Sequence, residues 1–217
     1  MNPTISIIMP VKNGSNYIAE ALESIRRQGC NVEIIVVDDG STDNTADIVS
    51  KYGCTVLSHK ESMGPVVAKN TGLQAAKGDY ILFMDHDDKL RDNVLKTMCE
   101  ALSDSPEFSA VQAQVQDFKS PDCGDSPVAV RPEPYYGLFT GAILIRRSVF
   151  DTIGLFPTTL TAGEIIDWSD RMSQHGLLIK KIDLVSTDRR VHNNNFGRTR
   201  RLEELKNYAA ILRRRIK

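Results

Sequence analysis

The sequence predicts an α/β fold, a mostly parallel but mixed sheet flanked by helices. Short apolar runs rich in Val and Ile alternate with amphipathic stretches over the first hundred or so residues, which is typical of consecutive βα units. Three of these runs end in clusters of polar residues. In such sheets ligands bind beyond the carboxyl ends of the strands. We therefore expect an open sheet with a binding site along one edge.

Composition and charge are compatible with this fold class. The chain has 217 residues, 41% of them hydrophobic and 25% charged, close to the average of globular domains. The net charge of -1 hides an asymmetry, because residues 188–217 hold ten Lys/Arg against three Asp/Glu and carry +7, while the preceding 187 residues carry -8. The acidic body argues against a nucleic-acid partner.

The first half is expected to hold four strands and four helices. The strands are predicted at residues 5–9, 33–37, 55–58 and 80–84. A helix over 17–28 has apolar residues at helical spacing, with Asn16 as its N-cap. Ser41 is expected to open a second helix, and the next two cover 64–76 and 92–103.

The second half changes character. Residues 117–137 hold four of the nine prolines and show no period, which predicts a binding loop or a crossover. Strands are expected at 138–146, at 178–182 and near Val185, with helices at 148–152 and 164–175. Residues 202–216 predict a basic amphipathic helix, packed on the body or contacting an anionic membrane surface or a partner protein.

Other features narrow the class of protein. No apolar run approaches the roughly 20 residues that span a bilayer, and the start of the chain lacks the basic and apolar regions of a secretory leader. We expect a cytoplasmic protein without a transmembrane segment. The four cysteines contain no Cys-x-x-Cys pair, so they are interpreted as reduced packing residues.

Acidic clusters follow two of the predicted strands. Asp85, Asp87 and Asp88 come directly after the strand at 80–84, and such carboxylates suit Mg²⁺ or Mn²⁺. Asp38 and Asp39 follow the strand at 33–37, where Asp39 could accept a hydrogen bond from a nucleobase or a ribose. In both places the alternative is that the aspartates cap the next helix and turn the chain.

Together these motifs resemble the family 2 inverting glycosyltransferases, which have the GT-A fold. The likeness covers about the first hundred residues in order and spacing. It is carried by residues 6–13 (SIIMPVKN), 21–28 (ALESIRRQ), 33–43 (EIIVVDDGSTD), 68–72 (AKNTG) and 77–88 (KGDYILFMDHDD). The absence of G-x-G-x-x-G and P-loop patterns argues against the common dinucleotide and NTP sites.

The resemblance implies a donor site for a nucleotide-diphosphate sugar, with a UDP-sugar as the expected donor. Its residues would be Pro10, Val11, Asn13, Asp39, Lys69 and Asp85, with Asp85 and Asp87 holding the Mn²⁺ or Mg²⁺ that bridges the diphosphate. Lys69 stands where many members have arginine, and Lys12 and Gly14 also depart from the common pattern. The acceptor would be a glycan, a lipid carrier or a peptide.

Residues 163–171 are similar to the acceptor-side segment of the family. The second member of the usual Glu-Asp pair is replaced by Ile165, so Glu164 or Asp167 would have to serve as the catalytic base. At i and i+3 the two share one helix face, and Glu164 is our first assignment. Either acid could instead cap the helix or pair with Arg171. Loss of catalysis, leaving a nucleotide-sugar-binding module or regulator, is the alternative function.

The C-terminal polar run would complete the site. The resemblance implies that a histidine from the C-terminal part can complete the metal shell, and His192 is the expected ligand; imidazole suits Mn²⁺ better than Mg²⁺. Three arginines, Arg189, Arg190 and Arg198, are expected to clamp the diphosphate. The predicted organisation is thus one catalytic domain over residues 1–187, with a nucleotide half at 1–101 and an acceptor half at 102–187, followed by a basic loop and helix at 188–217.

Overall fold

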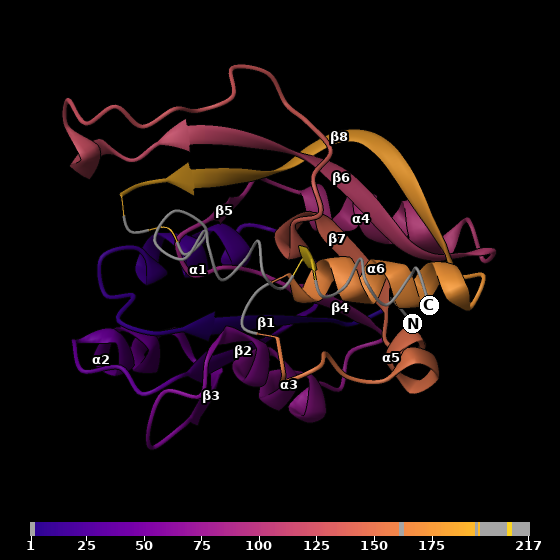
Figure 1. Ribbon diagram of the computed structural model, residues 1–217, viewed down its shortest axis with the longest axis horizontal. Coiled ribbons are helices and arrows are strands. Elements are labelled where there is room, and N and C mark those ends of the chain that lie inside the picture. Colours follow the sequence, from indigo (N-terminus) through magenta and orange to yellow (C-terminus); the bar gives the residue numbers. More distant parts are fainter. Residues whose placement is uncertain (1–2, 161–162, 194, 196–207, 210–217) are drawn as a thin grey trace.

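A computed structural model describes residues 3–160, 163–193, 195 and 208–209 of the chain. Its centre is one eight-stranded sheet in the order β3-β2-β1-β4-β7-β6-β8-β5 (Figure 1). The strands are β1 (Ile5–Val11), β2 (Val32–Asp38), β3 (Thr55–Ser58), β4 (Tyr80–Phe83), β5 (Lys89–Leu90), β6 (Phe108–Lys119), β7 (Ile143–Arg146) and β8 (Leu178–Val191). The predicted α/β class with a mixed, mostly parallel sheet is confirmed.

Strand direction decides which residues meet. β1, β2, β3 and β4 pair in parallel, β7 is antiparallel to both of its neighbours, and β6 and β8 are parallel to each other. It follows that β6 and β8 run in the same direction as β4. The two long strands lie side by side with their arrowheads pointing the same way (Figure 1). The carboxyl ends of β1, β2, β4, β6 and β8 therefore share one edge of the sheet, here called the carboxyl edge.

Helices cover both faces of the sheet. On one face α1 (Ile18–Arg26), α2 (Thr45–Val49) and α4 (Val94–Ser103) bury their apolar stripes. On the other face α3 (Pro65–Ala75), α5 (Ser148–Ile153) and α6 (Glu164–Gln174) do the same, with Trp168 fully buried. Short 3-10 turns lie at Ser50–Tyr52, Pro121–Cys123 and Thr140–Ala142. Two apolar layers thus hold the sheet between the helices, and burial of these side chains is the main stabilising term.

The second half of the sheet differs most from the sequence expectation. No strand was expected at β6, whose Gln and Ala residues have low strand propensity, but pairing with β7 and β8 on both sides makes it a twelve-residue strand. The two expected runs after residue 177 form the single strand β8, which continues through Asp188 to Val191. Its pairing with β6 shifts register three times, twice between Gln112 and Val115, where the two expected runs of β8 join.

Several element ends also differ. The N-cap of α1 is Tyr17 and not Asn16. The second helix begins at Thr45, because Ser41 instead accepts the backbone N–H of Asn13. β7 begins at Ile143, five residues later than expected. The predicted basic helix over 202–216 lies outside the described residues, apart from Tyr208 and Ala209. Within the described part of the chain, no helix has the length and hydropathy needed to cross a membrane.

Candidate functional site

The three aspartates after β4 form an acidic cluster at the carboxyl edge. One carboxylate oxygen from each of Asp85, Asp87 and Asp88 lies within 4.8 Å of the others. Asp85 is exposed, Asp87 is half-buried and Asp88 is buried. The backbone N–H of Asp88 donates to Asp85 O at 3.2 Å, so residues 85–88, here called the acidic loop, form a tight turn. None of the three aspartates caps α4, whose N-cap is Asn93 and which begins six residues later.

The end of β8 reaches this loop. His192 Nε2 lies 2.9 Å from Asp87 Oδ2, and Asn195 Nδ2 donates to the same oxygen at 3.3 Å. His192 is therefore close to the acidic loop, as expected, but contacts it through a hydrogen bond to Asp87. The Tyr17 ring lies 5.0 Å from the His192 ring and supports its orientation. The sheet brings these residues together, because β4 and β8 end at the same edge.

The crowded charges change the protonation of the loop. Burial acts to raise the pKa of Asp87, but the hydrogen bond from His192 and the nearby His86 and His192 charges lower it overall. Burial and the charges of Asp87 and Asp85 raise the pKa of Asp88 well above its ordinary value. Asp87 is thus the carboxylate held in its ionised form, the form that binds a metal.

A divalent cation fits these donors. Hard cations take carboxylate oxygens and complete their shell with water and phosphate oxygens, and exposed Asp85 leaves that side open. Asp87 and Asp85 are the residues that would hold the ion. Buried Asp88 is engaged with the protein, because its Oδ1 accepts the backbone N–H of Arg190 at 2.8 Å.

A second charged pair lies between α3 and α6. Lys69 Nζ contacts Glu164 Oε1 at 2.5 Å, and both side chains are nearly buried. Burial opposes the charge on Lys69, but Glu164 and Asp85 raise the pKa of the amine. Burial likewise opposes ionisation of Glu164, but Lys69 lowers the pKa of this carboxyl overall. Glu164 is therefore an anion at neutral pH. Its partner Lys69 also interacts electrostatically with Asp85, which links Glu164 to the acidic loop.

Asp167 has a different environment, one turn further along α6. Its Oδ2 accepts a hydrogen bond from Arg171 Nε at 2.8 Å. Arg171 also donates to the carbonyl oxygens of Ile153, Gly154 and Leu155. The pair anchors α6 to the end of α5. Of the two candidates for the base, Glu164 is in direct contact with Lys69, another predicted site residue.

We expect Asp167→Asn to lower the stability of the fold more than the rate of the reaction. The amide keeps the shape but weakens a charged hydrogen bond to Arg171, and such changes cost about 1–3 kcal/mol. Urea unfolding of Asp167→Asn beside Asp170→Asn, a change on the same helix, measures the cost. A folded Asp167→Asn protein of normal stability that has lost all transfer would reverse our order of the two acids.

Several of the residues predicted to bind the nucleotide lie at or just after the ends of β1 and β2. Pro10 and Val11 are buried at the end of β1, and Asn13 is exposed with a left-handed φ of 53°. Asn13 N donates to Ser41 Oγ at 2.9 Å, and Asn13 Oδ1 accepts from Thr42 N at 2.8 Å. These bonds join the loop after β1 to the loop after β2. The side-chain oxygen of Asn13 is thus already bonded to the protein.

Asp39 is also tied into the protein. Its two carboxylate oxygens accept hydrogen bonds from His59 Nδ1, Ser62 Oγ, Met63 N and Gly64 N at 2.7–2.9 Å. Burial acts against them, but these donors lower the pKa of the carboxyl. Four donors match the lone-pair positions of a carboxylate. Asp39 therefore holds the segment before α3 against the end of β2, and its predicted contact with the base or ribose remains a prediction.

The predicted arginine clamp is only partly free to bind a ligand. Arg189 pairs with Asp117 at 3.4 Å, lies over the Phe139 ring and keeps 27% of its side chain exposed. Arg190 is buried, and its guanidinium donates to groups of the protein. Arg198 lies outside the described residues. Of the two described arginines, Arg189 is the one that solvent reaches.

Sequence reasoning missed the packing partner of Gly14. A Cβ at this position would come within 2.5 Å of His86 Cδ2 and of Val11 Cγ2. The glycine therefore leaves room for the imidazole between the acidic loop and the loop after β1. The unusual Gly14 was a visible signal, but its partner 72 positions later was not, because the two meet only through the pairing of β1 with β4.

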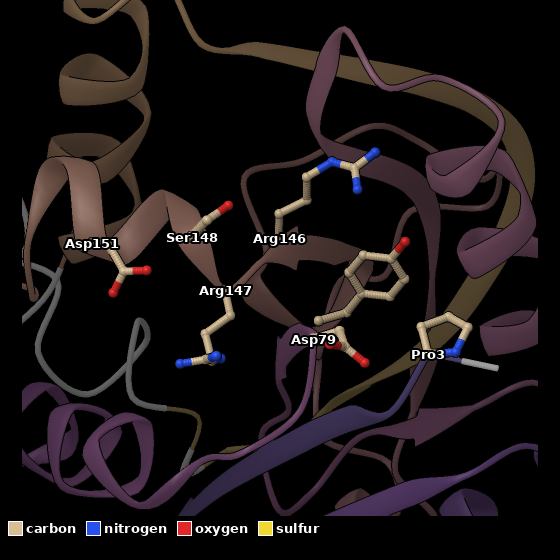
Figure 2. Close-up of a pocket in the computed structure, with 7 residues that line it drawn as sticks. Pro3, Asp79, Arg146, Arg147, Ser148 and Asp151 are labelled. Carbon is tan, nitrogen blue, oxygen red and sulfur yellow. The ribbon is translucent and has the colours of Figure 1, made fainter. Parts of the chain in front are cut away.

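A cavity of about 600 Å³ lies elsewhere. Figure 2 shows it around Arg147, Ser148 and Asp151, with Asp79 and Pro3 opposite. Asp79 directly precedes β4, whereas the acidic loop follows it. This cavity is therefore at the opposite edge of the sheet and is separate from the acidic cluster.

The open mixed sheet with an acidic loop at its carboxyl edge defines a GT-A type domain. Residues 6–154 match the sequence model of the family described as Glycosyl transferase family 2. That match covers more than half of the chain. The chain belongs to glycosyl transferase family 2.

Relatives and solved structures agree with this assignment. An uncharacterized glycosyltransferase, RP339 of Rickettsia prowazekii, is 40% identical over 179 residues, covering 73% of this chain and 55% of the relative. The putative glycosyltransferase EpsH of Bacillus subtilis is 30% identical over 167 residues, covering 69% and 48%. The chain thus spans about half the length of these two curated relatives.

Two solved structures share the fold. S. aureus TarS 1-349 in complex with UDP superposes with a TM-score of 0.69 and 25% identity, covering 92% of this chain and 64% of that one. The mannosyltransferase PcManGT from Pyrobaculum calidifontis, in complex with GDP-Man and Mn²⁺, has a TM-score of 0.66 and 22% identity, covering 86% and 56%. The predicted GT-A fold is confirmed.

Proposed function

We propose that this protein is a metal-dependent, inverting glycosyltransferase that moves a hexose from a nucleotide-diphosphate sugar to an acceptor. The observation that carries the proposal is that Asp85 of the acidic loop interacts electrostatically with both members of the Lys69–Glu164 pair. One group can hold the donor's diphosphate through a cation, and the other can take the acceptor's proton. UDP and GDP-Man in the two structural neighbours support a nucleotide-sugar donor.

The donor would lie across the ends of β1, β2 and β4. The loops after β1 and β2, joined through Asn13, would hold the nucleoside, with Pro10 and Val11 as an apolar wall. Asp85 and Asp87 would hold a divalent cation, Mn²⁺ or Mg²⁺, which when bound neutralises charge on the departing diphosphate. Arg189 supplies an accessible positive charge near the same carboxyl edge. We take a UDP-sugar as the first donor to test.

Glu164 is assigned as the base. An acceptor hydroxyl gives its proton to the Glu164 carboxylate while its oxygen attacks the anomeric carbon. The bond from that carbon to the diphosphate oxygen breaks, and attack from the opposite face inverts the configuration. Lys69 keeps Glu164 ionised and ready to accept the proton. A neutral acid in this place could not do so.

The first test is calorimetric titration of UDP with and without Mn²⁺. We expect binding that strengthens with Mn²⁺, and slow hydrolysis of a nucleotide sugar in a mass-spectrometric screen of donors. Nucleotide binding that ignores metal would contradict the proposed metal site. Binding of the nucleotide sugar with neither hydrolysis nor transfer would favour the alternative, a GT-A-like binding module or regulator, to which Ile165 in the usual base position also points.

Acceptor, cellular location and the roles of the two halves of the chain are parts of the same proposal. We retain a glycan, a lipid carrier or a peptide as acceptor, and a cytoplasmic location. Residues 1–101 supply β1, β2, β4 and the acidic loop, and residues 102–187 supply α6 with Glu164. This division supports a nucleotide half and an acceptor half within one sheet.

A further inference from the structure

Arg190 is a fully engaged cation beside the acidic loop. Its side chain is 4% exposed. Its Nε donates to Asp87 O at 2.9 Å, its Nη1 donates to Ser120 Oγ at 3.3 Å, and its Nη2 donates to Glu20 Oε2. Each of the three nitrogens thus already has a protein acceptor. This guanidinium is directed at the protein and not at a ligand.

Two of the bonds from Arg190 end on the acidic loop. The side chain holds the carbonyl of Asp87, and the backbone N–H holds Asp88 Oδ1 at 2.8 Å. Two residues later His192 contacts Asp87 Oδ2 at 2.9 Å. The end of β8 and His192 therefore contact the loop at the carbonyl oxygen of Asp87 and at the carboxylates of Asp87 and Asp88. These bonds determine where the Asp87 carboxylate points.

Other elements hold Arg190 in place. The guanidinium carbon lies 4.8 Å from the centroid of the Tyr17 ring and 4.7 Å from that of Phe118, so two aromatic rings flank it. Glu20 on α1 accepts from Arg190 and from Lys89, the latter at 2.9 Å. Partial burial acts to raise the pKa of Glu20, but Lys89 and Arg190 lower it overall. Glu20 is thus an ionised anchor for the guanidinium.

We propose that Arg190 is a positioning residue of the metal site, which fixes the acidic loop through Asp87 O and Asp88, and that Glu20 holds Arg190 in this role. The inference rests on the proposed metal-dependent function. A buried arginine is costly to desolvate unless its hydrogen bonds are met, and here they are met by Ser120, by Glu20 and by the loop that carries the proposed metal ligands. Arg190 acts through the loop and makes no contact with the ligand.

The test uses Arg190→Lys and Glu20→Gln, each with a matched control on α1. Lysine keeps the charge but has no planar fork, so it cannot reach Asp87 O, Ser120 and Glu20 together. Arg26→Lys is its control, because Arg26 also donates to a carbonyl oxygen and lies over a tyrosine ring, both of Tyr52, away from the acidic loop. Glu23→Gln is the control for Glu20→Gln. Glu23, like Glu20, lies on α1 and pairs with an arginine, in this case Arg26.

The first readout is hydrogen exchange of the metal-free protein. We expect Arg190→Lys to speed exchange in residues 84–90, and Glu20→Gln to do so by a smaller factor, while both controls leave this segment unchanged. The second readout is Mn²⁺ affinity in the presence of UDP. Loss of a group that orients metal ligands weakens metal binding by about 10–100-fold, and we expect Arg190→Lys in that range with metal-free UDP binding within a few-fold of the wild type.

The two readouts separate this inference from the proposed function. Unchanged exchange in residues 84–90 of both variants would overturn the positioning role, whatever the wild-type protein binds. Faster exchange with unaltered Mn²⁺ affinity would show a purely structural contact and would also overturn it. If Arg190→Lys does not fold, Glu20→Gln carries the test, because the Glu20 side chain is half exposed. A wild-type protein without Mn²⁺-dependent UDP binding would instead contradict the proposed function.

Discussion

Replacing Asp87 with asparagine is expected to abolish Mn²⁺-dependent nucleotide binding and transfer. Asp87 is the carboxylate of the acidic loop that His192 and Asn195 contact by hydrogen bonds, and burial acts to raise its pKa while His192 and His86 lower that pKa overall. An amide of the same shape loses the negative charge that attracts the cation. Changing a group that only supports metal ligands costs about 10–100-fold in affinity, so removing a ligand should cost more than about 100-fold. Titration of Mn²⁺ into the UDP-bound protein measures the loss.

The matched change is Asp92→Asn. Asp92 follows the acidic loop by four residues and pairs with Arg27 at 3.0 Å on the protein surface. We expect this variant to bind metal and nucleotide as the wild type does. Equal Mn²⁺ affinities for Asp87→Asn and Asp92→Asn would remove the acidic loop from the metal site. Because asparagine preserves size, a fall in melting temperature would identify a general loss of structure.

Replacing Glu164 with glutamine is expected to slow transfer by about 10²–10⁴-fold, the usual contribution of a general base. Nucleotide and Mn²⁺ affinities should stay within a few-fold of the wild type, since Glu164 is assigned to the acceptor's proton. The change leaves the buried Lys69 without its anionic partner. The double variant Lys69→Met/Glu164→Gln therefore accompanies it, and similar rates for the single and double variants would assign the loss to the base.

The pH dependence of Lys69→Met supplies an independent check on Glu164. Lys69 lowers the pKa of the Glu164 carboxyl, so its removal lets burial raise that pKa. A base works when deprotonated, and the acidic limb of the rate profile should therefore move to higher pH in Lys69→Met. An acidic limb that stays in place, or that moves to lower pH, would contradict the assignment of Glu164.

The local patterns of the first half predicted its structure well. The apolar runs of β1, β2, β3 and β4 are buried or paired where expected, and the acidic loop follows β4. β6 was missed, because Gln112 and Gln114 interrupt its apolar pattern. Both lie in a strand whose two neighbours supply its hydrogen bonds. Strand propensity is a weak guide where pairing on both sides decides the conformation.

The candidate site was predicted unevenly for the same reason. The acidic run after a predicted strand singled out Asp85 and Asp87, and the family resemblance singled out Glu164 and His192. It did not pair Lys69 with Glu164 or Arg190 with Glu20, because 95 and 170 positions separate these partners. Both contacts depend on which elements pack together, and no local pattern carries that information.

By itself the sequence determined the α/β class, the family and the residues that end each strand, because apolar periodicity and polar strand ends are local properties of the chain. The tertiary structure decided what each charged group does. The parallel course of β4 and β8 places His192 on Asp87, and the burial of Arg190 directs its guanidinium at the acidic loop. A charge acts on what lies within a few ångströms, and only the folded chain determines those neighbours.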